Sequence, residues 1–331
     1  MSFWVATYCT RSRFRSAQHG WCRRPLCMHK RVRALVIGAD GLIGSALSSA
    51  LGRSGHFVIE TTRRSRQEGE RNRILLDLAD DSFVTLLPKV DIAYFCAAMT
   101  GFAECQNDPG RAHQINVSAP NVIGRRLVQS GSRVVLLSTS AVFDCLEPRM
   151  ATDRPYSPRG VYGATKAAAE AAFLGLGPAA CVLRLTKVLT PETPLVRQWI
   201  DNLGASRHVE AIGDVGISPL KVEHVTSALL ALAEQPATGV YQISGAGDVS
   251  YAELALHLAR RLAASPSLVD RCDAVQYGIS QGEVLRFTSL DTSRLSYLTR
   301  FVPPAPLDVV DEVFGPALRA QRAGSAAAAS Q

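Results

Sequence analysis

From residue 33 onward, the chain alternates short hydrophobic runs with longer segments in which alanine and leucine recur at helical spacing. Short β-branched runs predict strands, and the longer periodic segments predict helices. The expected strands cover residues 34–37, 57–61, 91–96, 133–138, 180–185 and 240–243. The expected helices cover residues 43–53, 109–130, 162–174, 222–234 and 251–264. Strands that alternate with helices predict an α/β fold built on a doubly wound parallel sheet.

The alternation weakens after residue 186, where proline becomes frequent. Proline interrupts both helices and strand ladders, so a less regular region is expected there. Residues 222–244 again read as a helix followed by a strand. We therefore expect a dinucleotide-binding domain of residues 32–186 plus 222–244, interleaved with a smaller C-terminal substrate lobe of residues 187–221 plus 245–315. Residues 316–331 end in a low-complexity run and are expected to form a disordered tail.

The formal net charge of +7 comes from the beginning of the chain. Residues 1–31 contain Lys and Arg but no Asp or Glu, and the remaining cations and anions balance. A folded basic face for nucleic acid is therefore not expected. We expect residues 1–31 to be a disordered basic leader. It is either a transit-like segment or the product of an early start codon, with Met28 as the true first residue.

The remaining composition is that of an ordinary globular protein. No apolar run reaches the roughly 18 residues of a membrane span, so no membrane association is expected and a cytoplasmic location is favoured. Five cysteines lack paired spacing and grouping with histidine, which predicts reduced thiols and no metal site. They are Cys96, Cys105, Cys145, Cys181 and Cys272.

The first motif is Gly38-Ala-Asp-Gly41-Leu-Ile-Gly44, directly after the first expected strand and at the start of the first expected helix. Gly38 permits a tight turn, Gly41 lets the backbone approach a pyrophosphate, and Gly44 allows close contact between helix and strand. Free amide groups at the helix start, which includes Leu42 and Ile43, can receive the anion. The motif therefore predicts a dinucleotide-binding Rossmann domain.

The second motif is Tyr162-Gly-Ala-Thr-Lys166, at the start of an alanine-rich helix. A spacing of four places the phenol and the ammonium one turn apart on one helical face. A neighbouring Lys cation is expected to lower the pKa of the phenol, which gives a proton donor and acceptor usable near neutral pH. Tyr162 and Lys166 are therefore candidate catalytic residues.

The third motif is the expected strand 133–138 with the hydroxyl residues that end it, Ser138, Thr139 and Ser140. Doubly wound sheets place their sites at the carboxyl ends of strands. Any of the three hydroxyl groups could therefore donate a hydrogen bond to a substrate carbonyl.

The order and spacing of these motifs resemble the extended short-chain dehydrogenase/reductase superfamily, from residue 33 to about residue 314. Within it, the chain is most similar to dTDP-4-dehydrorhamnose reductases, through residues 97–100, 115–117, 137–144, 218–222, 239–245 and 290–294. The resemblance implies an oxidoreductase of carbohydrate biosynthesis that reduces a nucleotide-linked 4-keto sugar. It also implies Thr139, Tyr162 and Lys166 as catalytic residues, the last two also contacting the cofactor.

Further cofactor contacts are implied by the same resemblance. Asp77 and Leu78 would lie beside the adenine, whereas Ala97 and Ala98 would form a backbone wall near the phosphates and ribose. Asn116 would support the active site from an adjacent helix.

The type of dinucleotide can be inferred from the end of the second expected strand. An acid there accepts hydrogen bonds from the ribose 2′-hydroxyl of NAD, whereas arginine pairs with the 2′-phosphate of NADP. Arg63 and Arg64 follow this strand. Glu60 lies within the rough spacing of the NAD acid, but we place it in mid-strand. The sequence therefore favours NADP, with NAD as the alternative.

Two positions depart from the reductases that the chain resembles. Ser140 and Ala141 stand where those reductases usually carry an acid and an aromatic residue that face the sugar. The identity of the sugar is therefore open. So are two other functions, a nucleotide-sugar epimerase or dehydratase that recycles bound NAD, and a non-catalytic regulatory subunit that resembles the β subunit of methionine adenosyltransferase. A homodimer is a further expectation.

Overall fold

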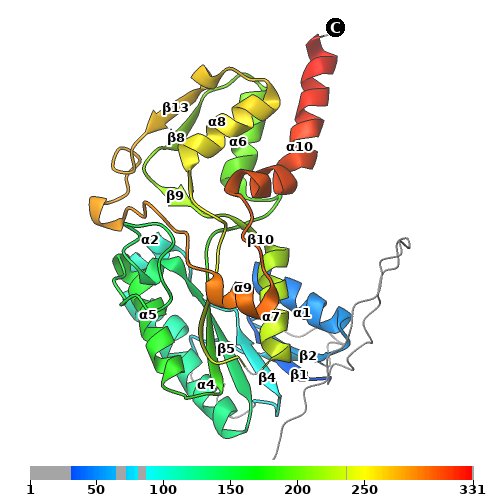
Figure 1. Cartoon of the computed structure of the whole chain (residues 1–331), viewed down its shortest axis with the longest axis vertical. Coiled ribbons are helices and arrows are strands. Elements are labelled where there is room, and N and C mark those ends of the chain that lie inside the picture. The colour runs from blue at the N-terminus through cyan, green and yellow to red at the C-terminus, as the bar shows by residue number, and fades with distance from the viewer. Residues whose placement is uncertain (1–30, 65–71, 81–86, 236, 330–331) are drawn as a thin grey trace, which may run out of the picture. The chain divides into compact units, whose positions relative to one another are not determined.

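A computed structural model describes residues 31–64, 72–80, 87–235 and 237–329. A seven-stranded sheet with the strand order β11-β6-β5-β4-β1-β2-β3 lies at the centre of the predicted dinucleotide-binding domain (Figure 1). Its strands are β1 (Arg33–Ile37), β2 (Phe57–Thr62), β3 (Arg73–Leu75), β4 (Ile92–Phe95), β5 (Arg133–Thr139), β6 (Ala180–Leu185) and β11 (Gly239–Ile243). Each neighbouring pair is parallel, which confirms the predicted doubly wound parallel sheet.

Helices cover both faces of this sheet (Figure 1). Along β1, alternate side chains enter two different cores, Ala34 and Val36 on one face and Leu35 on the other. Helices α1 (Leu42–Arg53) and α7 (Val222–Glu234) pack on the first face, and α4 (Ala119–Gln129) and α5 (Gly160–Leu174) pack on the second. Burial on both faces explains why these strands read as continuous apolar runs.

The order of the strands locates the crevice in which such sheets bind ligands. From β1, the sheet grows through β2 to β3 in one direction, and β4 then adds to the other side of β1. Ligands of open α/β sheets bind where the order reverses, beyond the carboxyl ends of the strands. Here that point lies between the loops that follow β1 and β4.

The helix expected at residues 109–130 is divided into three parts. Helix α3 (Pro109–His113) leads into a π-helical turn, η2 (Gln114–Ser118), and α4 follows. A π turn inserts one extra residue and often marks a functional site. It contains Asn116, which is buried at 1% exposure.

Most of the C-terminal lobe is built around a separate hydrophobic core, to which α6, α8 and α10 contribute (Figure 1). Its helices are α6 (Pro194–Gly204), α8 (Tyr251–Leu262) and α10 (Pro306–Ala329). Its strands form pairs: β7 (Val188–Leu189) with β10 (Leu220–Lys221), β8 (Val209–Ile212) with β13 (Val269–Cys272), and β9 (Gly216–Ile217) with β12 (Val249–Ser250). Helix α9 (Ser293–Thr299) returns to the large sheet, where Leu295 is buried.

Two expectations about the ends of the chain have different outcomes. The leader, residues 1–31, lies outside the described residues except for Arg31. The expectation of a disordered tail from residue 316 is wrong at the start of that segment. Helix α10 continues through Pro316, and Leu318 is buried in the core of the C-terminal lobe. Alanine is the strongest helix former, so the composition that was interpreted as disorder also favours this helix.

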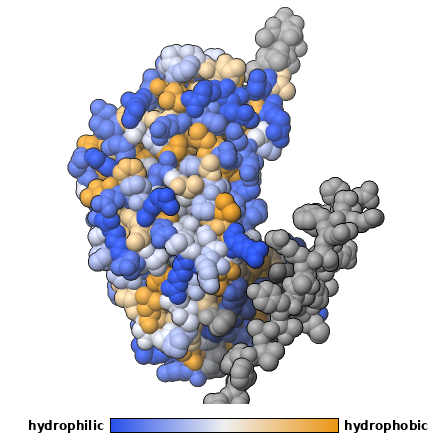
Figure 2. Space-filling view, viewed as in Figure 1, coloured by the Kyte–Doolittle hydropathy of each residue, from blue (hydrophilic) through white to orange (hydrophobic). Residues whose placement is uncertain are grey.

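The length and hydropathy of a helix decide whether it could span a membrane. Across the described ranges, no helix is long and apolar enough to cross a membrane. On the face in Figure 2, hydrophobic residues are scattered among hydrophilic ones. Scattered apolar residues are normal on a protein surface and indicate no function by themselves.

Candidate active site

The glycine loop between β1 and α1 is packed so closely that two of its positions exclude a side chain. Gly38 has a φ of +89°, and a Cβ atom there would lie 2.6 Å from the backbone nitrogen of Ala97. A Cβ atom on Gly44 would lie 2.1 Å from the carbonyl oxygen of Gly38. The loop can therefore hold its conformation only with glycine at these positions.

Helix α1 begins without a side-chain cap. Its N-cap is Gly41, which has an extended backbone, and its first turn contains no acidic residue. The first amide groups of a helix have no partner within the helix, and they carry the positive end of its dipole. The start of α1 is therefore suited to a pyrophosphate.

A cavity of about 490 Å³ extends along the ends of β1, β2 and β4. Its lining includes predicted cofactor residues: Gly38, Gly41, Leu42, Ile43, Arg63, Asp77, Leu78, Ala97 and Ala98. The predicted residues Gly44, Arg64, Asn116, Tyr162 and Lys166 are not in the lining. The lining also includes residues that the sequence did not indicate: Ile37, Asp40, Thr61, Thr62, Leu76, Cys96, Met99, Thr100, Glu104, Arg111 and Ile115.

The two acids near the end of β2 have different surroundings. Glu60 lies within β2, its carboxylate is 3.0 Å from Nε of Arg73, and it is not part of the cavity lining. Asp40, which the sequence analysis did not single out, does line the cavity. The mid-strand placement of Glu60 agrees with its pairing to a neighbouring strand.

The three predicted catalytic side chains come from β5 and α5. Thr139 ends β5, and its side chain is hydrogen-bonded to that of Tyr162 in the first turn of α5. Lys166, at 3% exposure, donates a hydrogen bond from Nζ to the carbonyl oxygen of Leu137 at 2.6 Å. Ser138 is buried, and its hydroxyl makes no hydrogen bond within the described part of the chain. The hydrogen bond to Tyr162 therefore favours Thr139 over Ser138 as its hydroxyl partner.

Burial determines the ionisation of both residues of the Tyr-Lys motif. It raises the pKa of Tyr162 to about 12, against the lowering effect of the Thr139 hydrogen bond. It lowers the pKa of Lys166 to about 8, against the raising effect of the Glu170 carboxylate. The expectation that the Lys166 cation lowers the pKa of the phenol is therefore wrong for the protein without ligand, because desolvation outweighs the Thr139 hydrogen bond, the one lowering effect on this group. The phenol is protonated near neutral pH and is available as a proton donor.

Gly163 is a closely packed position next to Tyr162 that the sequence did not indicate. A Cβ atom on this residue would lie 2.2 Å from the carbonyl oxygen of Ala141, in the turn after β5. Glycine therefore allows the start of α5 to approach the end of β5. The sequence signal for this close approach is a glycine, the residue without a side chain, directly after Tyr162 in the Tyr-Lys motif.

Asn116 connects the cavity wall with α5. Its amide accepts a hydrogen bond from the backbone N–H of Met99 at 2.8 Å and donates to the Met99 carbonyl at 3.0 Å. It also donates to Oγ1 of Thr165 at 3.2 Å, and that hydroxyl donates to the carbonyl of Tyr162 at 2.9 Å. The π turn thus places Asn116 between the cavity wall at Met99 and the helix that carries Tyr162.

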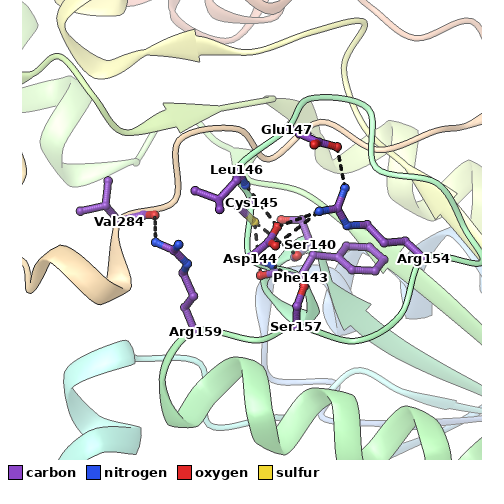
Figure 3. Close-up of polar contacts among 10 residues, drawn as sticks. All are labelled: Ser140, Phe143, Asp144, Cys145, Leu146, Glu147, Arg154, Ser157, Arg159 and Val284. Atoms are coloured by element: carbon purple, nitrogen blue, oxygen red, sulfur yellow. Dashed lines mark hydrogen bonds and ion pairs between the residues drawn. The ribbon is translucent and has the colours of Figure 1, made fainter.

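The segment that follows Ser140 is held by polar contacts (Figure 3). Arg154 is 3.3 Å from the carboxylate of Asp144 and 2.8 Å from that of Glu147. Arg159, which precedes α5, donates to the carbonyl of Val284 in the C-terminal lobe at 3.4 Å. These contacts fix the segment between the end of β5 and the catalytic helix.

A buried ion pair lies one helical turn after Lys166. Glu170 and Arg184 are almost fully buried, with 2.8 Å between Oε2 and Nη2. Glu170 also accepts from the hydroxyl of Tyr156 at 3.0 Å, and Arg184 donates to Gln242 at 3.0 Å. Such a pair is tolerated in a protein interior because additional hydrogen bonds satisfy it. It joins α5 to β6 and β11.

A parallel sheet with a glycine loop at its switch point, an uncapped helix start and a Thr-Tyr-Lys group beyond β5 defines a Rossmann-type dehydrogenase/reductase of the extended short-chain class. The sequence matches the model of the RmlD substrate binding domain family over residues 32–306. The chain belongs to this family, and the resemblance found in the sequence is confirmed.

The chain is also similar to individual proteins of known name, in sequence or in structure. The dTDP-4-dehydrorhamnose reductase of Mycobacterium tuberculosis is 28% identical over 255 residues, which cover 74% of this chain and 80% of that protein. The β subunit of methionine adenosyltransferase 2 of Pongo abelii is 30% identical over 155 residues, or 46% of each chain. The structure of MoeE5 in complex with UDP-glucuronic acid and NAD is 26% identical, with a TM-score of 0.70 over 83% of this chain and 95% of that one.

Proposed function

We propose that the chain is an NADPH-dependent reductase of a nucleotide-linked 4-keto sugar. The observation that carries this proposal is that the Tyr162 phenol is hydrogen-bonded to Thr139 at the end of β5, while Lys166, one turn further along α5, donates to the backbone of the same strand. Tyr162 packs against the cluster that contains Met99, which lines the cavity. Similarity to proteins named as reductases supports the same reaction.

The residues around the cavity suit a dinucleotide. The crowded glycine loop brings its backbone close to a ligand, and the uncapped start of α1 supplies amide donors for a pyrophosphate. Arg63 lines the cavity at the end of β2, where it would pair with the 2′-phosphate of NADPH. When bound, the reduced nicotinamide supplies the hydride.

The protein supplies the proton and orients the carbonyl group. Tyr162 and Thr139 would donate hydrogen bonds to the carbonyl oxygen, and Tyr162 would transfer its proton to that oxygen as reduction proceeds. The phenolate that remains would be stabilised by the cationic Lys166. With a pKa of about 8, Lys166 is mostly charged at neutral pH. The raised pKa of Tyr162 keeps the phenol protonated before the reaction.

Two other functions make different predictions. A recycling epimerase or dehydratase would retain its dinucleotide through purification, because it must reoxidise that dinucleotide within each cycle. A regulatory subunit, suggested by the similarity to the methionine adenosyltransferase β subunit, would not need Tyr162 or Lys166. Their placement beside the cavity favours a catalytic protein. A cytoplasmic location and a homodimer stay predictions.

The test is an absorbance assay of NADPH oxidation with a panel of nucleotide-linked 4-keto sugars, together with titrations of NADPH and NADH. Turnover of any member is expected and would identify the sugar. Tight dinucleotide binding without turnover across the panel would contradict the reductase. In that case, dinucleotide that copurifies with the protein would indicate the recycling enzyme, and its absence the regulatory subunit.

A further inference from the structure

The acidic residue of the glycine loop, Asp40, lies in the cavity lining beside the end of β2. It lines the cavity together with Thr62 and Arg63. In Rossmann domains, the carboxyl end of β2 meets the 2′ position of the adenosine ribose. A negative side chain therefore lies near the position where NADP carries a phosphate and NAD carries a hydroxyl group.

Several contacts hold the Asp40 carboxylate at this position. Oγ1 of Thr62 donates a hydrogen bond to one of its oxygens at 2.7 Å, and Nη2 of Arg73 lies 3.2 Å from the other. The same Thr62 hydroxyl accepts from the backbone N–H of Arg64 at 3.0 Å. An ionised carboxylate has about four lone-pair positions, so Asp40 can accept a further donor such as a ribose hydroxyl.

The pairing with Arg73 does not remove the negative character of this site. Arg73 is shared, because its Nε lies 3.0 Å from the carboxylate of Glu60. The carboxylates of Asp40 and Glu60 therefore both face the guanidinium of Arg73. Arg63 and Arg64 follow Thr62 in the chain and add positive charge, and Arg63 also lines the cavity. A 2′-phosphate would therefore meet attraction and repulsion at the same time.

We propose that Asp40 is a specificity-determining residue for the coenzyme. Its carboxylate repels a 2′-phosphate and accepts a hydrogen bond from a 2′-hydroxyl, while Arg63 attracts the phosphate. The chain consequently binds NADH as well as NADPH, and Asp40 sets the ratio of the two affinities. This inference rests on the proposed use of a nicotinamide dinucleotide, and it does not depend on which sugar is reduced.

The test compares the full chain with its Asp40→Asn variant by isothermal titration calorimetry with NADPH and with NADH. Removing one charge near a partly exposed phosphate is expected to tighten NADPH binding about tenfold. Losing the stronger charged acceptor is expected to weaken NADH binding about threefold. Adenosine 2′,5′-bisphosphate and AMP serve as probes without nicotinamide, and their affinities should change in the same directions.

Matched variants test whether the change in coenzyme affinity comes from Asp40 itself or from any loss of charge near Arg73. Glu60→Gln removes a charge from the same Arg73 cluster but outside the cavity lining, and it should leave the affinity ratio within about twofold of wild type. Arg63→Met should weaken NADPH without affecting NADH. If Asp40→Asn does not fold, Asp40→Ser replaces it with the same expected direction.

An unchanged NADPH to NADH affinity ratio in the Asp40 variant, or an equal shift in the Glu60 variant, would overturn the inference. Binding is measured without a sugar, so these outcomes do not depend on the reductase assay. Failure of every sugar in that assay would count against the proposed reaction and would leave the binding result intact.

Discussion

The loop after β1 and the region after β5 serve one site in different ways. The loop after β1 depends on the absence of side chains, since there is no room for a Cβ atom at Gly38 or Gly44 and Gly41 provides no side-chain cap. The second relies on buried functional groups, with the pKa of Tyr162 raised and that of Lys166 lowered. Dinucleotide binding should therefore depend on the backbone conformation of the glycine loop, and turnover on the ionisation of Tyr162 and Lys166. Substitutions in the two regions should change affinity and turnover separately.

The largest expected effect comes from removing the phenolic hydroxyl. Tyr162→Phe should reduce turnover by about a thousandfold, because a positioned proton donor contributes roughly 10²- to 10⁴-fold. NADPH affinity should stay within about twofold of wild type, since Tyr162 does not line the cavity. Stopped-flow reduction and calorimetry measure the two quantities. Turnover near the wild-type level would refute the assigned role of Tyr162.

The next effect is on binding. Gly38→Ala should weaken dinucleotide affinity by at least about a hundredfold, because the new Cβ atom would collide with the backbone of Ala97.

Gly55→Ala is the matched control. Gly55 also has a positive φ, +82°, but no atom lies within 4 Å of the added Cβ position. The control should lose about 1–2 kcal/mol of unfolding free energy while dinucleotide affinity is retained. Equal affinities in the two variants would contradict the steric argument.

The smallest of the three effects is a pH dependence. Lys166 is cationic below its pKa of about 8 and loses its charge as the pH rises through that value. We expect kcat/KM to fall about tenfold per pH unit above pH 8, because this ratio reports groups of the free enzyme. Lys166→Arg retains its charge throughout, so its remaining activity should show no such fall. A fall at the same pH in that variant would assign the titration to another group.

Much of the dinucleotide-binding half could be predicted because its signals are local. Each strand of the large sheet except β3 was anticipated, and the glycine motif lies at the expected junction of strand and helix. Strand β3 covers only Arg73–Leu75 at the sheet edge, too short to show a period. Arg111 was missed because it joins the cavity from a segment distant in sequence, and Asp40 and Thr62 were missed because their contact with each other joins two loops that are 22 residues apart.

The C-terminal lobe could be anticipated only in outline. Its strand pairs are short, and β8 pairs with β13 across about 60 residues of sequence. Helix α9 returns to the large sheet, and α10 extends into the segment expected to be disordered. The shortest of these strands leave no periodic pattern in the sequence, since a strand of two residues cannot display alternation.

By itself, the sequence determined the class of fold, the glycine loop and the Tyr-Lys spacing, because steric exclusion and helical periodicity act between residues that are close in the chain. The tertiary structure alone decided the pKa values of Tyr162 and Lys166, which depend on burial by several elements. It also decided that Asp40, and not Glu60, lines the cavity at the end of β2. Desolvation and charge pairing depend on distances in space, and residue order does not specify those distances.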